Sequence, residues 1–132
     1  MKTSNAVVYL VDDDDAVRES LTACLEAYGF TVDAFASGEA FQRRAVAGLI
    51  GCLILDLQLP QQNGLDILHW LRRTLHSALP VLMISGHGDP AIRAAAFRAG
   101  IDGYIEKPFQ APVLAEMIRA IFDECQTNAD PA

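Results

Sequence analysis

Five short runs of apolar residues recur along the chain, with amphipathic segments between them. The runs cover residues 6–11, 31–35, 51–55, 81–85 and 103–106. The first, third and fourth runs are apolar without alternation, which is typical of parallel strands that helices cover on both faces. The pattern therefore predicts five strands, most of them buried in the middle of the protein.

The segments between these strands have the periodicity of helices. Two apolar stripes stand out: Val17, Leu21, Cys24, Leu25 and Tyr28, and then Val113, Leu114, Met117, Ile118, Ile121 and Phe122. Gly29 is placed to end the first of these two helices. Further helices are predicted over 64–73, over 89–100 and, from a weaker pattern, over 38–47.

Strand and helix alternate five times, which specifies an α/β fold. Right-handed crossovers between parallel strands place helices on both faces of a sheet. We therefore predict one domain over residues 1–125, with a three-layer, doubly wound, five-stranded parallel sheet. The polar segment 126–132 is expected to be a frayed end or the start of a linker.

Charge and cysteine content narrow the possible partners and the location. The chain has 10 Lys and Arg against 17 Asp and Glu, a net charge of −7, and no basic block. The chain itself therefore suits neither nucleic acid nor an anionic membrane. The cysteines lack CxxC pairing and are interpreted as reduced core residues: Cys24, Cys52 and Cys125. With no signal-peptide or membrane-span pattern at the N-terminus, we expect a cytoplasmic protein.

Charged side chains gather at the carboxyl ends of the predicted strands, where doubly wound sheets bind ligands. Four consecutive carboxylates, Asp12–Asp15, follow the first strand, and Asp56 closes the third. Ser85 ends the fourth strand, and Lys107 follows the fifth. Two carboxylates about 4 Å apart repel by roughly 4 kcal/mol at an effective dielectric of ~20, so this crowding implies a cation. Hard oxygen ligands of this kind suit Mg²⁺, or Mn²⁺ in its place.

Four motifs carry a resemblance to a known family. They are VDDD on the first strand, LDLQLPQQNGLDIL on the third, ISGHGD on the fourth and GYIEKPF on the fifth. Over residues 6–125 they resemble the receiver domain of two-component response regulators, in the CheY-like superfamily. SGHGD and IEKPF are most similar to the FixJ-type branch, whose receivers are usually joined to a helix-turn-helix DNA-binding domain. The resemblance implies the strand order 2-1-3-4-5.

The resemblance also implies a phosphorylation site. Asp56 would accept a phosphoryl group from a sensor histidine kinase, and the domain would catalyse only its own phosphorylation and dephosphorylation. The Mg²⁺ ligands would be Asp12, Asp13, Asp56 and the main-chain carbonyl of Gln58. Ser85 and Lys107 would each contact a phosphoryl oxygen, with the Lys107–Pro108 peptide in the cis form.

A candidate interaction surface lies on the fourth helix and fifth strand. Arg93 and Phe97 are four residues apart, so they share a helix face, and they lie off the apolar stripe of that helix. The resemblance gives Tyr104 the position of an aromatic switch that follows Ser85, and FixJ-like receivers pair through this surface when phosphorylated. We therefore expect a phosphorylation-promoted homodimer. The alternative is that Phe97 is buried over Tyr104.

Neighbouring residues have simpler interpretations. Asp14 or Asp15 is expected to cap the first helix, and Pro60 and Gly64 to shape the loop after Asp56. The histidines lack metal-ligand spacing and are interpreted as surface or loop residues: His69, His76 and His87.

Two other functions stay open. A phosphatase of the haloacid dehalogenase type would use Asp12 as its nucleophile, and residues 12–14 fit its D-x-D pattern. That fold is longer, however, and has a second acidic pair after a later strand. A receiver scaffold could also serve as a phosphorylation-independent interaction module. An EF-hand is excluded, because Val17 and Ala23 stand where its loop needs Gly and Glu.

Overall fold

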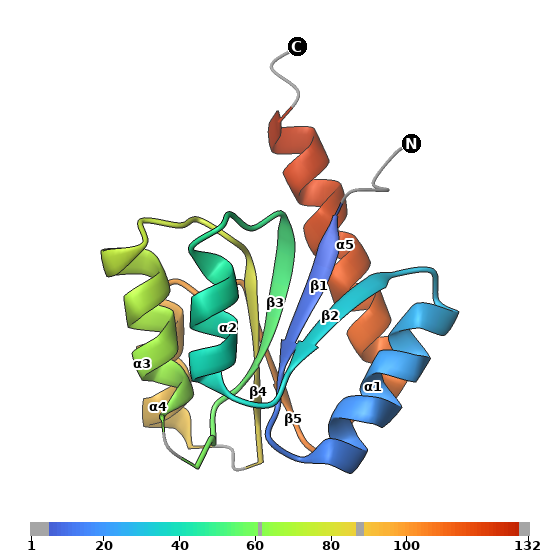
Figure 1. Cartoon of the computed structure of the whole chain (residues 1–132), viewed down its shortest axis with the longest axis horizontal. Coiled ribbons are helices and arrows are strands. Elements are labelled where there is room, and N and C mark those ends of the chain that lie inside the picture. Colours follow the sequence, from blue (N-terminus) through green and yellow to red (C-terminus); the bar gives the residue numbers. More distant parts are fainter. Residues whose placement is uncertain (1–5, 61, 87–88, 130–132) are drawn as a thin grey trace.

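A parallel five-stranded sheet forms the middle layer of the protein (Figure 1). The computed structural model describes residues 6–60, 62–86 and 89–129, with side chains as far as residue 124. The strands are β1 (Val7–Val11), β2 (Thr31–Phe35), β3 (Gly51–Asp56), β4 (Val81–Ser85) and β5 (Gly103–Glu106). Their order is β2-β1-β3-β4-β5, so the predicted strands and the implied order are confirmed.

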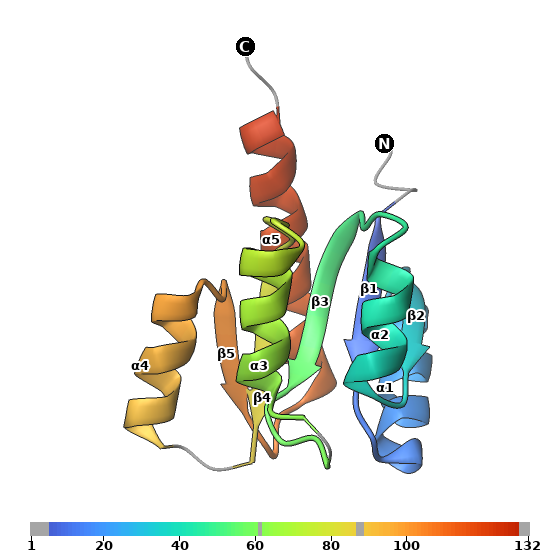
Figure 2. The ribbon, with the colours of Figure 1, turned by 60° about the vertical axis from the view of Figure 1, so that its left-hand side comes forward.

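Helices cover both faces of the sheet, which confirms the three layers. On one face lie α1 (Asp15–Ala27) and α5 (Ala111–Ala129) (Figures 1 and 2). On the other lie α2 (Gly38–Ala45), α3 (Gly64–His69) and α4 (Pro90–Ala99). The carboxyl ends of all five strands meet at one edge of the sheet, at the bottom of Figure 1.

Each buried strand supplies side chains to two apolar cores, because consecutive residues of a strand point to opposite faces. In β1, Tyr9 and Val11 pack with residues of α2, α3 and α4. Val8 and Leu10 pack with residues of α1 and α5. An unbroken apolar run is therefore needed to fill both cores, which explains the pattern from which the strands were predicted.

The ends of the helices follow from local hydrogen bonding. Asp14 is the cap of α1, because its carboxylate accepts the main-chain N–H groups of the second and third residues of the helix, and Asp15 is the first residue of α1. Asp89 caps α4, with Pro90 at the first helical position. Gly100 ends α4 with φ 105°, a left-handed conformation that glycine adopts without strain.

The helix predicted over 64–73 is present, but its hydrogen bonding changes partway along. After His69 the chain continues as a π-helical turn, η2 (Trp70–Thr74), and the N–H of Leu75 donates to the carbonyl of Trp70 at 3.0 Å. The side chain of Arg72, on this turn, donates to three main-chain carbonyls, those of Ser77, Leu79 and Gly100. Arg72 thus joins η2 to the segment before β4 and to the end of α4.

Helix α5 runs further than the sequence predicts. It continues to Ala129, so residues 126–129 are helical rather than part of an irregular tail. Neither Gly nor another Pro follows Pro112 until Pro131, and a helix usually ends before the residue that precedes a proline. The domain boundary after residue 125 stays a prediction. In the part of the chain that the structure describes, no helix has the length and apolar character needed to cross a membrane.

The cysteines and histidines have unremarkable positions where they can be described. Cys52 is buried in the core and Cys24 is partly buried on α1, whereas the side chain of Cys125 lies outside the described part of the chain. His76 is exposed in a loop and His69 is partly buried on α3. His87 lies outside the described residues.

Replacement of Gly51 by Ala is expected to lower the free energy of unfolding by about 3 kcal/mol or more. Gly51 has φ +136°, and a Cβ atom would overlap the main-chain oxygen of Val7 where β1 and β3 pair. Gly48 has φ +106° but faces open space, so Gly48→Ala measures backbone strain alone, at about 1–2 kcal/mol. Urea unfolding gives the comparison, and equal losses in the two variants would contradict the predicted overlap.

Candidate functional site

The parallel pairing of β1 with β3 brings three carboxylates together. Val11 lies opposite Leu55, so Asp12 and Asp56 leave the sheet side by side. Carboxylate oxygens of Asp12, Asp13 and Asp56 all lie within 4.8 Å of one another. Asp12 is 1% exposed and Asp56 is 4% exposed, whereas Asp13 is exposed. The sequence prediction of an acidic cluster at this edge is therefore correct in its geometry.

Lys107 lies between the two buried carboxylates. Its ammonium donates a hydrogen bond to Oδ2 of Asp56 at 3.0 Å and lies 3.9 Å from Oδ2 of Asp12. Its main-chain N–H donates to the carbonyl of Ser85 at 2.8 Å, which joins the ends of β4 and β5. The Lys107–Pro108 peptide is cis, as the resemblance implies. Burial acts to lower the pKa of Lys107, but the hydrogen bond to Asp56 and the surrounding carboxylate charges outweigh it and raise that pKa.

The loop after β3 holds Asp56 from the other side. The main-chain N–H of Gln58 donates to Oδ1 of Asp56 at 2.8 Å, and the loop closes through an antiparallel bridge between Gln58 and Asn63. Gly64 lies so close that a Cβ atom there would be 2.8 Å from the main-chain oxygen of Asp56. The expected role of Gly64 in this loop thus has a steric basis. That the Gln58 carbonyl binds a metal stays a prediction.

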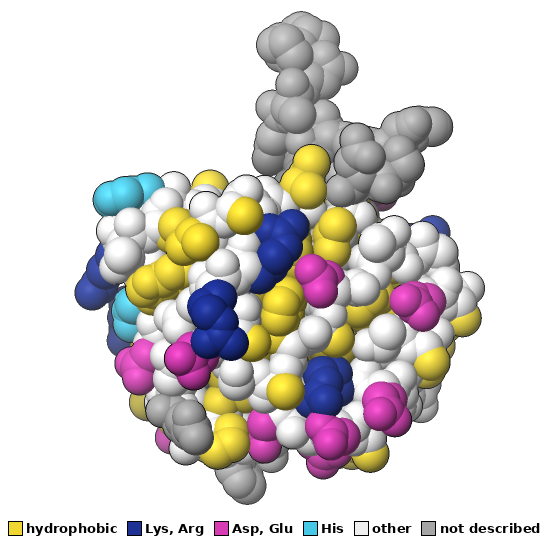
Figure 3. Space-filling model, in the orientation of Figure 1, with side chains coloured by type: hydrophobic (Ala, Val, Ile, Leu, Met, Phe, Trp, Pro, Cys, Tyr) yellow, Lys and Arg dark blue, Asp and Glu magenta, His cyan; other side chains and the backbone are white. Residues whose placement is uncertain are grey.

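The four consecutive carboxylates have different partners. Oδ1 of Asp12 accepts the N–H of Asp14 at 2.9 Å, Asp14 caps α1, and Asp15 forms an ion pair with Arg18. Among the described residues, Oδ2 of Asp12 is a buried oxygen that has no hydrogen-bond donor. Acidic side chains also gather over the first turns of α1, on the lower part of the face in Figure 3.

This arrangement fits a divalent cation. Burial raises the pKa of Asp12, and the neighbouring charge of Asp56 adds to this effect, while the Asp14 N–H and Lys107 act against it. Three carboxylates and one ammonium have a formal charge of −2, which one divalent cation balances. The Asp12 oxygen that has no hydrogen-bond donor would supply a ligand atom, and oxygen-only ligands are those that Mg²⁺ and Mn²⁺ prefer.

The other predicted residues lie next to this cluster or on the neighbouring surface. Ser85 is fully buried at the end of β4. The guanidinium carbon of Arg93 lies 5.8 Å from the ring centroid of Phe97 and 5.5 Å from that of Tyr104, so the three side chains form one patch. Phe97 is 44% exposed, which contradicts the alternative that it is buried over Tyr104.

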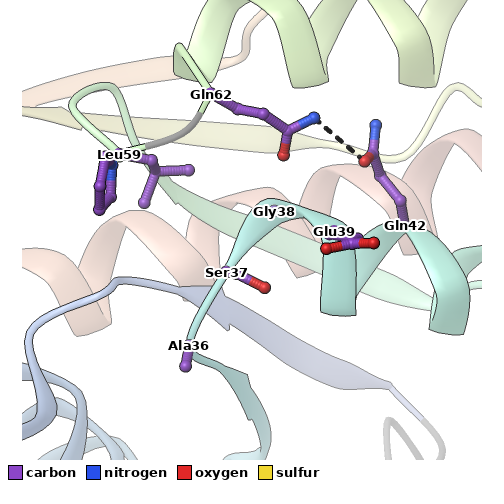
Figure 4. Close-up of a pocket in the computed structure, with 8 residues that line it drawn as sticks. Ala36, Ser37, Gly38, Glu39, Gln42, Leu59 and Gln62 are labelled. Atoms are coloured by element: carbon purple, nitrogen blue, oxygen red, sulfur yellow. Dashed lines mark hydrogen bonds between the residues drawn. The ribbon is translucent and has the colours of Figure 1, made fainter.

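A hollow of about 480 Å³ lies between the loop after β3 and the start of α2 (Figure 4). Gln62 donates a hydrogen bond to Gln42 across it at 3.2 Å. Glu39 is the acidic side chain among its lining residues, and neither Asp12 nor Asp56 contributes to its wall. This hollow is therefore separate from the carboxylate cluster.

Arg18 lies beside the site but is not among the residues predicted from the sequence. Its guanidinium donates to the main-chain oxygen of Asp12 at 2.9 Å and to the carboxylate of Asp15. The available signal was a cation in the first turn of a helix that otherwise begins with acids, a position that the helix dipole disfavours.

The fold and the site together define a class of protein: doubly wound α/β domains with carboxylates and a lysine at the carboxyl edge of the sheet. The family model of the response regulator receiver domain matches residues 8–119, and the chain belongs to this family. The haloacid dehalogenase alternative is thereby excluded.

Curated relatives agree with this assignment. The response regulator protein TodT of Pseudomonas putida is 37% identical over 120 residues, which are 91% of this chain and 52% of TodT. The transcriptional regulatory protein FixJ of Rhizobium meliloti is 39% identical over 111 residues, 84% of this chain and 54% of FixJ. The chain thus spans about half the length of these relatives.

Solved structures agree as well. The FixJ-N crystal structure is 36% identical, with a TM-score of 0.81 over 90% of this chain and 93% of that one. Full-length FixJ from B. japonicum is 32% identical, with a TM-score of 0.84 over 95% of this chain and 61% of that one. A CheY-like receiver domain protein from Methanospirillum hungatei is 25% identical, with a TM-score of 0.87 over 93% and 98%.

Replacement of Asp12 by Asn is expected to raise the free energy of unfolding of the metal-free protein by about 1–2 kcal/mol at neutral pH. Asn keeps the acceptor for the Asp14 N–H but removes a buried charge that lacks a donor. The gain shrinks as the pH falls toward the ordinary carboxyl pKa of 3.8, because wild-type Asp12, whose folded-state pKa is raised, then takes up its proton.

Urea unfolding in the presence of a chelator, at several pH values, measures this difference. Asp13→Asn serves as the comparison at an exposed position. It is expected to raise the free energy of unfolding by a smaller amount, and added salt should reduce this gain because it screens exposed charges. An Asp12→Asn protein less stable than wild type at neutral pH would contradict the account of the charge balance.

Proposed function

We propose that the chain is the phosphoacceptor domain of a two-component system, in which Asp56 takes a phosphoryl group from a sensor histidine kinase in the cytoplasm. The observation that carries this proposal is the buried Asp56 carboxylate, which Lys107 contacts at 3.0 Å beside an Asp12 oxygen that has no hydrogen-bond donor among the described residues. Membership of the receiver family supports it.

Asp56 acts as a nucleophile. One of its carboxylate oxygens attacks the phosphorus of a phosphohistidine, and the P–N bond breaks, with the electron pair remaining on the imidazole of the kinase. The product is an acyl phosphate on Asp56. Hydrogen bonds from Gln58 N–H and Lys107 hold the two carboxylate oxygens before the reaction, and this fixes the plane of the nucleophile. Hydrolysis of the acyl phosphate returns the carboxylate.

Three groups stabilise the transferred phosphoryl group, two of them cations. Lys107 and the hydroxyl of Ser85 each bind a phosphoryl oxygen. The divalent cation, Mg²⁺ or Mn²⁺, neutralises further negative charge when bound. Asp12, Asp13, Asp56 and the main-chain carbonyl of Gln58 would hold this cation. Apart from transfer to and from its own Asp56, the domain catalyses no reaction in this proposal.

Phosphorylation acts on the rest of the protein by changing the patch of Arg93, Phe97 and Tyr104. Ser85 shifts toward the phosphoryl group and Tyr104 changes rotamer, which biases an equilibrium between monomer and homodimer. The relatives named transcriptional regulatory protein FixJ are longer than this chain, and full-length FixJ extends beyond the matched part. We propose that a helix-turn-helix output domain, if joined to this chain, makes the contact with DNA.

Incubation with acetyl phosphate and Mg²⁺ is expected to add one phosphoryl group to the wild-type protein and none to Asp56→Asn. The reason is that Asp56 is the carboxylate that both Lys107 and the Gln58 N–H orient. Intact mass spectrometry under neutral conditions measures the gain.

Asp66→Asn is the matched control, because it removes an exposed carboxylate from α3 and leaves the cluster intact. The wild type is also expected to gain no phosphoryl group when a chelator removes the metal. A phosphoryl group retained by Asp56→Asn would overturn the proposal. Equal fractions of monomer and homodimer in wild type and Asp56→Asn under these conditions would favour the phosphorylation-independent interaction module.

Beryllofluoride with Mg²⁺ is expected to increase the dimer fraction of the wild-type protein, and Phe97→Asp to abolish this increase. A buried charge at the centre of the patch costs more free energy than the apolar contact that it replaces. Sedimentation velocity at protein concentrations on the order of 10–100 µM measures the fraction.

Val46→Asp is the control, since it puts the same charge on another exposed apolar residue, at the end of α2. It should dimerise like the wild type. A dimer that persists in Phe97→Asp, or monomer fractions that do not respond to beryllofluoride, would contradict the role of the patch.

A further inference from the structure

Arg18 is a largely buried cation beside the carboxylate cluster. Its side chain is 18% exposed, and it lies on the first turn of α1. One nitrogen of the guanidinium, Nη1, donates to the main-chain oxygen of Asp12 at 2.9 Å. The other, Nη2, donates to the carboxylate of Asp15. The planar guanidinium thus spans the connection between β1 and α1.

The helix itself does not account for a cation at this position. The N-terminus of a helix carries a partial positive charge, so it favours acids and disfavours arginine. Asp14 and Asp15 follow this preference, but Arg18 opposes it. The two hydrogen bonds of its guanidinium offset the unfavourable placement, and one of them ends on a ligand residue of the proposed metal site.

The hydrogen bonds of Asp12 make the role of Arg18 specific. The Asp12 N–H donates to the carbonyl of Phe35 at 3.2 Å, its carbonyl accepts from Arg18, and its Oδ1 accepts from Asp14. Only Oδ2 has no hydrogen-bond donor among the described residues. Because the peptide between Asp12 and Asp13 is planar, a fixed Asp12 carbonyl also fixes the N–H and Cα of Asp13.

We propose that Arg18 is a positioning residue for the metal: it fixes the peptide unit between Asp12 and Asp13 and so holds both carboxylates in the arrangement that binds the divalent cation. This inference rests on the proposed function, since the cation has its role at a phosphoacceptor site. It adds a residue that touches neither the metal nor the phosphoryl group.

Charge alone gives the opposite expectation, which makes the inference testable. Loss of a cation next to an acidic cluster strengthens the attraction for a metal ion, whereas loss of positioning weakens binding. Arg18 and Asp15 form a neutral pair, so removing both leaves the net charge unchanged. The double variant therefore separates the effect of positioning from the effect of charge, and we expect positioning to dominate.

The test measures binding of Mn²⁺, through the electron paramagnetic resonance signal of the free ion, and of Mg²⁺ by competition. Arg18→Met keeps an apolar stem and removes every donor, and its Kd is expected to rise about tenfold, as for other residues that orient metal ligands. The charge-matched double variant Arg18→Met/Asp15→Asn should show the same rise. Asp15→Asn alone keeps the bond to Asp12 and should stay within about twofold of wild type.

Phosphorylation by acetyl phosphate gives a second readout. In Arg18→Met the Mg²⁺ concentration for half-maximal rate should rise with the Kd, while the rate at saturating Mg²⁺ stays at the wild-type value. Arg18→Lys, which keeps one donor group, should fall between wild type and Arg18→Met, and it serves as the test variant if Arg18→Met does not fold. Circular dichroism of the metal-free proteins checks folding.

Wild-type or tighter metal binding in Arg18→Met, or a double variant restored to wild-type affinity, would overturn the positioning role. The positioning role would also be overturned if Arg18→Met kept the wild-type Mg²⁺ concentration for half-maximal rate but had a lower rate at saturating Mg²⁺. These results leave the proposed function intact as long as wild-type Asp56 is phosphorylated. A wild-type protein that binds the metal but gains no phosphoryl group would instead overturn the proposed function.

Discussion

Repulsion among the carboxylates at the ends of β1 and β3 is the constraint on which the site depends. Asp12 and Asp56 are buried side by side, and the Lys107 ammonium is the cation between them. This ammonium balances one of the three negative charges of Asp12, Asp13 and Asp56, so the cluster keeps a local excess of negative charge. The other two acids after β1 do not add to it, because Asp14 caps α1 and Asp15 pairs with Arg18. Four consecutive carboxylates are thus compatible with a stable fold.

The doubly wound sheet places this local charge near the surface of α4 and β5. β1 and β3 are adjacent in the order 2-1-3-4-5 and are buried on both faces, and Asp12 and Asp56 lie at their ends. β4 and β5 complete the edge, where the Lys107 N–H is bonded to the carbonyl of Ser85. Tyr104 lies on the same strand β5 and packs with Arg93 of α4. Strand β5 therefore links the cluster, through Lys107, to the patch of Arg93, Phe97 and Tyr104.

The sequence predicts the parts of this arrangement that depend on periodicity and on strand ends. Unbroken apolar runs indicate β1, β3 and β4, and the positions of Asp12, Asp56 and Lys107 at the strand ends indicate the site. Contacts that end on main-chain atoms of distant segments leave no such pattern. Arg72 is the example, since it binds the carbonyl of Gly100, 28 residues away in the sequence. Arg18 binds the carbonyl of Asp12 over a shorter separation, and only its unusual place in the first turn of α1 indicates a special role. Local propensity likewise gives no signal for the π-helical turn η2.

The most direct test of the central claim locates the phosphoryl group chemically. Borohydride reduces an aspartyl phosphate to homoserine, which peptide mapping by mass spectrometry can find after incubation of the protein with acetyl phosphate and Mg²⁺. The proposed role of Asp56 as the phosphoacceptor predicts homoserine at position 56 and at no other aspartate. Homoserine at position 12, or at no position in a protein that has gained a phosphoryl group, would contradict it.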